Sequence, residues 1–188
     1  MAKKLLNPTT ALYPLPVVMV TTSDPKRMGN IITIAWTGIL CSEPPMVGIS
    51  VRPQRYSYPL IQESKEFVIN IPTENLTYAT DYCGTYSGRD TDKFAALNLT
   101  PVPARMVQAP LIKECPVNLE CRVTREVSLG SHQLFIAEVV AIHADEEVLS
   151  DSDQIQWEET KPVAYCRGRY VSLGRQLGKH GFSRAQNQ

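Results

Sequence analysis

The segment from Ser50 to Ser57, with the sequence Ser-Val-Arg-Pro-Gln-Arg-Tyr-Ser, brings two arginines and two hydroxyl side chains together. It directly follows a strand-like run and opens a helix-like turn. Arginine supplies a planar fork of donors, and hydroxyls with helix N-terminal amides can complete a cradle for the oxygens of a phosphate monoester. The candidates are Ser50, Arg52, Arg55 and Ser57. By composition alone, an ordinary polar strand end is the simpler explanation.

A second polar segment, residues 87–94, has the sequence Ser-Gly-Arg-Asp-Thr-Asp-Lys-Phe. Gly88 permits a tight turn, and Asp90 or Thr91 can start a short helix that runs through Leu97. Lys93 then lies in the first turns of that helix. Taken alone, the segment is better explained as a helix-capping loop with surface charges.

A third segment is the β-branched run from Gly29 to Thr37, which is followed by Cys-Ser-Glu-Pro-Pro at residues 41–45. A strand edge beside small and polar residues can present backbone N–H and C=O groups to a flat heterocycle. The alternative is a strand buried in the core.

The elements that must position these segments are mostly strands. Strands are expected over residues 16–22, 30–37, 46–51, 66–71, 117–124 and 132–143, and short helices over 56–64, 73–83 and 90–97. We expect Thr73 to cap the second helix. Several strands with turn signals, and helices that are inserted rather than alternating, favour a barrel or sandwich over a parallel βαβ sheet.

Side-chain alternation predicts which strand faces are buried. Val47, Ile49 and Val51 share one face of their strand and indicate a core face. Residues 117–124 alternate between apolar and polar types, which predicts a half-buried strand with Asn118 and Glu120 on the polar face. The long apolar run over residues 132–143 is expected to be largely buried.

Composition narrows the function classes. The 188 residues suit one domain, and 19 basic against 19 acidic residues argue against general binding to nucleic acid or to a membrane surface. No apolar stretch reaches the roughly 20 residues of a membrane helix. Prolines at positions 8, 14 and 16 interrupt any signal-peptide core, so a cytoplasmic location is expected.

Motifs for other chemistries are missing from the sequence. The five cysteines are dispersed without a C-x-x-C pair and the three histidines are far apart, so no metal site is expected. Neither a dinucleotide-binding G-x-G-x-x-G after a strand, nor a P-loop, nor a G-x-S-x-G elbow occurs.

The C-terminal part is asymmetric in charge. Residues 145–159 hold seven acids and no Lys or Arg, whereas the residues from Thr160 onward hold six basic residues and no acid. A solvated acidic loop and a basic tail explain the pattern, and the alternative is a basic segment near an anion on its own subunit or a partner. We expect one domain over residues 1–172 and a basic, flexible tail over residues 173–188.

Together, the three segments resemble the flavin-reductase-like family of FMN-binding split barrels, including its flavoredoxin branch. The resemblance rests on the order of the motifs: an Asn-x-x-Thr strand from Asn30 to Thr33, a residue pair before Pro-Pro, Ser-x-Arg-x-x-Arg-x-Ser, Ser-Gly-x-Asp-x-Asp-Lys-Phe, and His132 opening a long strand. It covers roughly residues 10–172.

The resemblance implies a mainly β protein: a six-stranded Greek-key FMN-binding split β-barrel with short peripheral helices, working as a homodimer with FMN near the subunit interface. It implies phosphate contacts from the Ser50–Ser57 segment and from Lys93, and a backbone near Ala35 that faces the isoalloxazine. The implied cofactor-binding residues are Asn30, Thr33, Ala35, Trp36, Thr37, Cys41, Ser50, Arg52, Arg55, Ser57 and Lys93, and the implied catalytic residue is His132.

One residue departs from the family pattern. The ring-contact strand often carries small residues, whereas this chain has the bulky Trp36. Trp36 could stack near the flavin or restrict its open face, which bears on access for a nicotinamide.

The implied function is an oxidoreductase that accepts hydride from NADH or NADPH and passes electrons to flavin or to a redox protein partner. The alternative is a flavoredoxin-type FMN carrier that does not react with NAD(P)H. A third class is a flavin-binding barrel with an unrelated task. His132 could position the nicotinamide or hydrogen-bond the flavin, and a structural histidine is the alternative.

Overall fold

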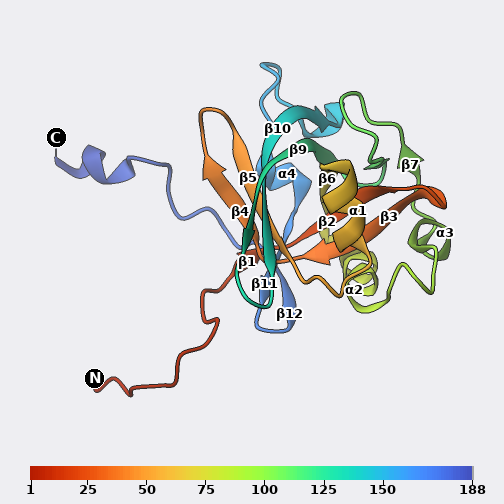
Figure 1. The fold of residues 1–188 in the computed structure, drawn as a ribbon. Coiled ribbons are helices and arrows are strands. Elements are labelled where there is room, and N and C mark those ends of the chain that lie inside the picture. Colours follow the sequence, from red (N-terminus) through yellow and green to blue (C-terminus); the bar gives the residue numbers. More distant parts are fainter. Residues whose placement is uncertain (188) are drawn as a thin grey trace.

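The computed structural model describes residues 1–187 (Figure 1). The strands are β1 (Leu15–Pro16), β2 (Val18–Asp24), β3 (Arg27–Ile34), β4 (Thr37–Cys41), β5 (Met46–Val51), β6 (Glu66–Ile71), β7 (Pro101–Val102), β8 (Leu111–Ile112), β9 (Val117–Ser128), β10 (Gln133–Ala144), β11 (Val163–Cys166) and β12 (Arg169–Ser172). The α-helices are α1 (Ser57–Ser64), α2 (Thr77–Thr85), α3 (Lys93–Leu97) and α4 (Trp157–Thr160), and the 3₁₀ turns are η1 (Glu74–Leu76), η2 (Glu146–Val148) and η3 (Phe182–Asn187).

The main sheet is antiparallel and has the strand order β3-β2-β6-β9-β10-β5-β4. Strands β3 and β4 are therefore opposite edges, although only Ala35 and Trp36 separate them along the chain. Three residue steps can span at most about 11 Å, so the sheet must curl until its edges meet. The backbone N–H of Ser50 on β5 donates to the carbonyl of Trp36 at 2.9 Å, which extends the β4–β5 pairing to the last residue before β4. The expected mainly β split barrel is thus confirmed, with seven strands in the sheet rather than six.

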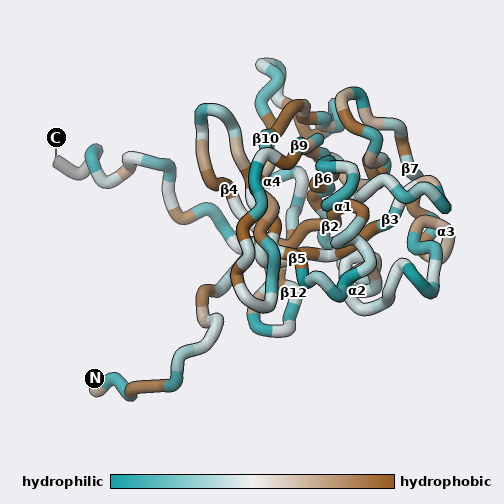
Figure 2. Tube along the Cα trace, in the orientation of Figure 1, coloured by the Kyte–Doolittle hydropathy of each residue, from teal (hydrophilic) through white to brown (hydrophobic). Residues whose placement is uncertain are grey.

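Alternation along the strands supplies two separate cores, and Figure 2 shows hydrophobic residues concentrated along the strands. Val20, Ile49 and Phe135 point into the barrel with Ile61 of α1. On the outer face of the sheet, Met19 of β2 packs under α2 and α3. Helices α2 and α3 thereby hold the segment that joins them, residues 86–92, against the outside of the barrel.

Several element boundaries differ from the expected ones. The run over residues 30–37 is not one strand, because β3 ends at Ile34 and β4 begins at Thr37 on the opposite edge. The run over residues 16–22 is likewise split between β1 and β2. No side chain of Thr73 caps the second helix; a 3₁₀ turn precedes α2 instead. Helix α3 begins later than expected, because Asp92 rather than Asp90 or Thr91 accepts from the backbone N–H of Ala95.

The prediction that β9 has a solvated polar face is wrong for the first half of the strand. Asn118 and Glu120 are buried, because Glu120 is covered by the loop at residues 105–107 and Asn118 by Ile112 of β8. Glu120 accepts hydrogen bonds from the backbone N–H groups of Arg105 (2.8 Å), Met106 (2.6 Å) and Val107 (3.0 Å). Apolar and polar side chains of β9 therefore do point to opposite faces, but in the first half of the strand protein covers both faces.

The run over residues 132–143 is less buried than expected. Within β10, Phe135 and Ala137 are fully buried, most other residues are half-buried, and Ile142 is 58% exposed. Together with Ile39 (83% exposed) on β4, Ile142 belongs to an apolar surface of the barrel. In this single chain, that surface faces solvent.

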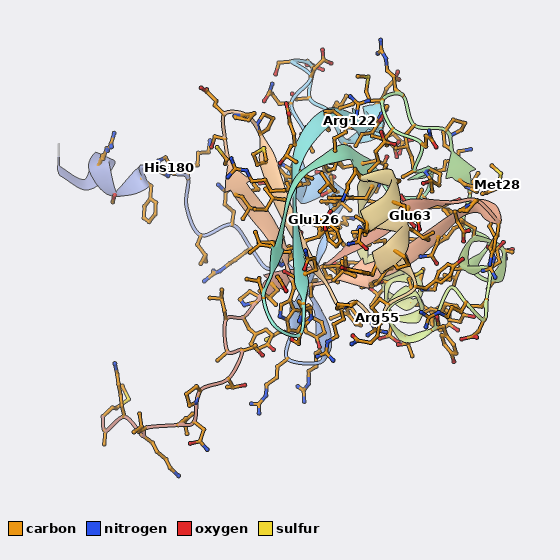
Figure 3. The ribbon with its side chains drawn as sticks, viewed as in Figure 1. Met28, Arg55, Glu63, Arg122, Glu126 and His180 are labelled. Carbon is orange, nitrogen blue, oxygen red and sulfur yellow. The ribbon has the colours of Figure 1, made fainter. Side chains whose placement is uncertain are left out.

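The termini leave the barrel. Figure 1 shows both ends of the chain running away from the body, and His180 lies on the C-terminal segment well outside it (Figure 3). Residues 173–184 are exposed, and Gln188 of the expected tail lies outside the described residues. The flexibility of this tail stays a prediction. Across the described chain, each helix is too short or too polar to cross a membrane.

Candidate functional site

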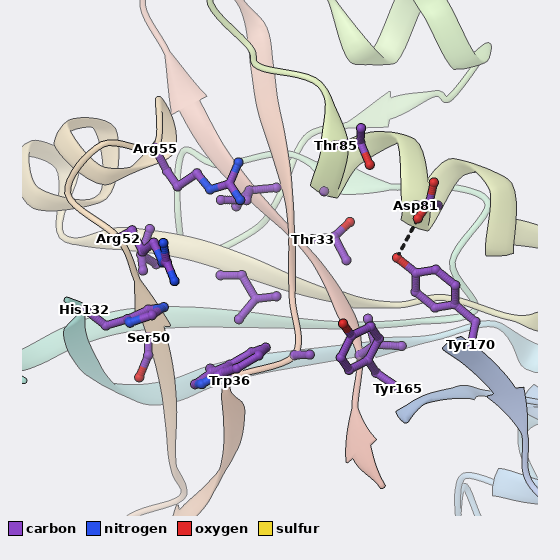
Figure 4. A pocket seen from close by; sticks show the side chains of 16 residues that line it. Thr33, Trp36, Ser50, Arg52, Arg55, Asp81, Thr85, His132, Tyr165 and Tyr170 are labelled. Carbon is purple, nitrogen blue, oxygen red and sulfur yellow. Dashed lines mark hydrogen bonds between the residues drawn. The ribbon is translucent and has the colours of Figure 1, made fainter. Parts of the chain in front are cut away.

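A cavity of about 420 Å³ opens where the two edges of the sheet meet (Figure 4). Its floor is apolar and comes from β3 and β5, with Ile32, Ile34 and Val51. Trp36 and His132 lie on one side of it, and Tyr165 and Tyr170 on another. The cavity exists because the chain passes from β3 to β4 through only two residues, which brings both edges and their side chains to one place.

A narrower cavity of about 180 Å³ continues from the first one, sharing Ile32, Arg55 and Gly84 with it. Arg55, Arg89 and Lys93 supply three cationic side chains to its lining, and no carboxylate lines it. Such a lining favours an anion. The two cavities together suit a ligand with a flat apolar part and an anionic end.

Asn30 and Ser57 form a buried pair in the narrow cavity. The Asn30 Nδ2 group donates to the Ser57 hydroxyl oxygen at 2.7 Å, and both residues are less than 5% exposed. Because the Ser57 oxygen accepts this bond, its hydroxyl proton is available to an acceptor in the cavity. A Cβ atom at Gly88 would lie 2.0 Å from the Asn30 Oδ1 atom, so only glycine fits the wall at that position.

Lys93 is buried at the start of α3. Its Nζ atom donates to the carbonyls of Ile31 at 2.7 Å and Cys83 at 2.8 Å, which leaves one N–H direction free. Burial lowers the pKa of Lys93 to about 8, Cys83 opposes this change, and Arg55 adds to it. Lys93 lines the narrow cavity, so an anion bound there would favour its charged ammonium form.

Helix α1 begins at this cavity. Among the described residues no side chain caps its N-terminus at Tyr56; the Tyr58 N–H donates to the carbonyl of Arg55 at 3.0 Å and Pro59 has no N–H, which leaves the Ser57 N–H as the uncapped donor of the first three residues. Uncapped helix N-termini attract anions. The helix itself is anchored by Ile61, which is fully buried in the barrel core.

His132 and Trp36 stack at the mouth of the wide cavity. Their ring centroids are 6.2 Å apart and their planes differ by 8°. Ser131 Oγ lies 2.9 Å from His132 Nδ1, and Nε2 has no hydrogen-bond partner among the described side chains. Burial, and then the positive charge of Arg52, lower the pKa of His132, so the ring is mostly neutral at pH 7.

The two candidate arginines separate in the structure. Arg55 lines both cavities, whereas Arg52 lines only the wide one, near His132 (Figure 4). Ser50 and Thr33 also line the wide cavity, and the Thr33 hydroxyl donates to the carbonyl of Thr80 on α2. Arg52 and Arg55 therefore share the wide cavity, but only Arg55 reaches the narrow one.

Two candidates lie outside both cavities. Cys41 is exposed at the far end of β4, and Thr37 lines a different hollow beside the N-terminal segment. The register of β4 explains this, because the strand runs away from the junction at Trp36. All other candidates line one or both cavities: Asn30, Thr33, Ala35, Trp36, Ser50, Arg52, Arg55, Ser57, Lys93 and His132.

Sequence reasoning missed a wall of the site. Asp81 on α2 and Tyr170 on β12 line the wide cavity, and the Tyr170 hydroxyl donates to the Asp81 Oδ1 atom at 3.1 Å. Burial and this carboxylate raise the pKa of Tyr170 to about 12. No motif links the two residues, because 89 positions separate them.

Comparisons with known proteins agree with this architecture. A family model described as "Flavin reductase like domain" matches residues 10–174. An uncharacterized protein of Archaeoglobus fulgidus is 37% identical over 146 residues, which cover 77% of this chain and 81% of that protein.

Solved structures are also similar. Flavoredoxin of Desulfovibrio vulgaris (Miyazaki F) has a TM-score of 0.89 at 36% identity, covering 96% of this chain and 98% of that one. Nitrilotriacetate monooxygenase component B from Bacillus cereus has a TM-score of 0.84 at 22% identity, covering 95% and 100%, which shows the fold alone. From the family match and the relatives, the chain belongs to the flavin reductase like domain family.

Proposed function

We propose that this protein binds FMN and is an oxidoreductase, accepting hydride from NADH or NADPH and passing electrons to free flavin or to a protein partner. The observation that carries the proposal is the pair of joined cavities, one wide and apolar, the other narrow, cationic and without a carboxylate. Their order matches the two ends of FMN, a flat ring system and a phosphate.

The residues of the narrow cavity fit a phosphate dianion. Arg55 can offer a planar fork of donors, and Lys93 a buried ammonium with a free N–H. The bond from Asn30 leaves the Ser57 hydroxyl proton available to an acceptor, and the Ser57 backbone N–H at the start of α1 adds a further donor. These groups would hold the flavin phosphate.

The wide cavity fits the ring system. Ile32, Ile34 and Val51 offer an apolar floor, and the backbone from Thr33 to Trp36 lies at the closing edge of the sheet. When bound, FMN supplies the hydride and electron chemistry. His132, mostly neutral, would hold its Nε2 atom toward the ligands at the mouth, and Trp36 would limit their approach and shield the site from water.

Absorption spectroscopy of the purified protein tests the proposal. We expect a bound-flavin spectrum, or its appearance after FMN is added and excess FMN removed, and rapid bleaching under anaerobic conditions with NADH or NADPH. A protein that retains no FMN would overturn the proposal.

A flavoredoxin-type carrier is the second candidate. It is supported by the Trp36–His132 stack across the mouth, which narrows the approach for a nicotinamide, and by the 36% identity to a flavoredoxin over nearly the whole chain. In that case the flavin spectrum persists with both nicotinamides and bleaches only with a reduced protein donor.

We also propose that the protein works as a homodimer. Ile39, Leu40 and Ile142 are more than half exposed, and a hollow of about 410 Å³ beside Ile39 and Ile142 is lined mainly by apolar side chains. A large exposed apolar surface of this kind is typical of protein interfaces. Light scattering is expected to give twice the 21.0 kDa chain mass, and Ile142→Asp is expected to give monomers. A wild-type monomer would contradict the proposal.

A further inference from the structure

The third hollow at the site is cationic and is not explained by the flavin phosphate. It has a volume of about 370 Å³ and is lined by Arg52, Gln54, Arg55 and Ser131. Arg52 and Arg55 also line the wide cavity, so the hollow adjoins it on the side where His132 lies (Figure 4). The narrow cavity, by contrast, excludes Arg52 and Ser131.

Neither arginine of the hollow has an acidic partner. The three ion pairs among the described residues use other side chains, and no carboxylate lines the hollow. Two arginines that line one hollow without a counter-charge give it a positive potential, which favours an anion there. Ser131 and Gln54 add a hydroxyl and an amide as neutral donors.

The surroundings of the hollow indicate the kind of anion. The hollow opens beside the stacked rings of Trp36 and His132, where a flat heterocycle can pack. The positive charge of Arg52 acts on the ring of His132, because it helps to lower the pKa of His132. A ligand that reaches both features needs an aromatic ring and, a short distance away, a phosphate group.

We propose that Arg52, Gln54 and Ser131 form a second anion site, which binds a phosphate group of the nicotinamide dinucleotide while its ring approaches the mouth at Trp36 and His132. The inference rests on the proposed function and deepens it by giving the two arginines different roles. Arg55 serves the flavin phosphate, and Arg52 serves the electron donor. The bound group is either the pyrophosphate of both nicotinamides or the 2′-phosphate that only NADPH carries.

Calorimetric titration of FMN-loaded protein tests the second site without turnover. The probes are ADP-ribose, which carries a pyrophosphate, adenosine 2′,5′-bisphosphate, which carries the 2′-phosphate, and inorganic phosphate as the bare anion. We expect at least one nucleotide to bind, and Arg52→Ala to weaken it about tenfold or more, as for the loss of a charge-assisted contact. Arg52→Lys keeps the positive charge but not the planar fork of donors, so its affinity for the nucleotide should lie between those of wild type and Arg52→Ala.

The matched control is Arg105→Ala. Arg105 is exposed, lines none of the three hollows, and uses only its backbone N–H for the bond to Glu120. This variant should bind the nucleotide within twofold of wild type. Arg52→Ala should lose less FMN affinity than Arg55→Ala, and the circular dichroism spectrum reports that the variant is folded.

The outcomes separate the two proposals. Binding of adenosine 2′,5′-bisphosphate assigns the site to the 2′-phosphate, and binding of ADP-ribose alone assigns it to the pyrophosphate; both support the inference. It is wrong if neither binds, if inorganic phosphate binds as tightly as the nucleotides, or if Arg52→Ala loses FMN as strongly as Arg55→Ala. A wild-type protein that fails to load FMN overturns the proposed function first, and this inference with it.

Discussion

Two clusters of polar side chains occupy comparable places on the sheet but differ in how their hydrogen bonds are used. In the interior cluster, Asn70 donates to the carbonyl of Met19 at 3.0 Å and accepts from Ile112 N–H (2.9 Å) and Asn118 Nδ2 (2.8 Å). Glu120, nearby on β9, accepts three backbone N–H groups. Each of these polar side chains has protein partners.

The cavity cluster of Asn30, Arg55, Ser57 and Lys93 is left with donors that have no protein acceptor. The Ser57 hydroxyl proton, one N–H of Lys93 and the Arg55 guanidinium face a cavity instead. Buried polar groups are normally paired, so unused donors that converge on one space indicate a ligand. The interior cluster is built for stability, and the cavity cluster for binding.

The largest effect is expected where the interior cluster is broken. Glu120→Ala leaves three backbone N–H groups without an acceptor and should lower the free energy of unfolding by about 3 to 5 kcal/mol. Denaturant unfolding measures this loss. A change below about 1 kcal/mol would mean that the loop over residues 103–110 is not held by this carboxylate.

The same carboxylate predicts acid sensitivity. Burial alone raises the pKa of Glu120, but the hydrogen bonds from Arg105, His143, Met106 and Val107 outweigh it, and the net pKa is lowered. Its stabilising contribution is therefore complete above the ordinary value of 4.5 and is lost as the pH falls below it. Glu120→Gln should flatten this part of the stability curve.

In the cavity cluster, Arg55→Ala should leave stability nearly unchanged and weaken FMN binding by about 1.5 to 3 kcal/mol, or roughly 10- to 100-fold. Arg55 is exposed and has no partner among the described ion pairs, so its removal breaks no internal bond. Fluorescence titration with FMN measures the affinity, and riboflavin, which lacks the phosphate, is the matched ligand. Equal losses for both ligands would argue against a phosphate contact.

A smaller, pH-dependent effect is expected from Lys93, whose pKa lies at about 8. A phosphate dianion favours the ammonium, so FMN affinity should fall as the pH rises above this value, by at most about tenfold per pH unit. Riboflavin should show no such fall. Lys93→Met should remove the pH dependence, and an unchanged slope in this variant would assign the titration to another group.

The smallest effect on binding is expected at the mouth of the cavity. His132→Ala removes the partner of the Trp36 stack but no donor of the phosphate cradle, so FMN affinity should stay within about threefold, or 0.7 kcal/mol. Stopped-flow reduction by NADH or NADPH should become slower. An unchanged reduction rate would make His132 a structural residue.

Much of the site followed from local patterns. The residue types of the Ser50–Ser57 segment and of the helix that carries Lys93 permit a phosphate contact, but it was the order of the motifs, through the family resemblance, that selected them; alternation along β5 indicated its core face. These features depend on neighbours within a few positions, which the sequence displays directly.

Long-range features were not predictable in the same way. The polar residues Asn118 and Glu120 of β9 were expected to face solvent, because nothing local shows that the segment over residues 105–112 would cover them. Asp81 and Tyr170 meet only because α2 and the β11–β12 hairpin pack at one cavity. Thr37 and Cys41, which the resemblance implied as cofactor contacts, lie outside the two cavities because β4 begins at Thr37 and runs away from them.

The sequence by itself determined which stretches favour strands and which segment has residue types that suit a phosphate, since both depend on side chains close together in the chain. The tertiary structure decided how those groups are divided. The chain passes from β3 to β4 through only Ala35 and Trp36, and in the closed sheet Arg52 and Arg55 both line the wide cavity, whereas Arg55 alone of the two reaches the narrow one. Barrel closure is a property of all strands packed together, so no short stretch of residues can encode it alone.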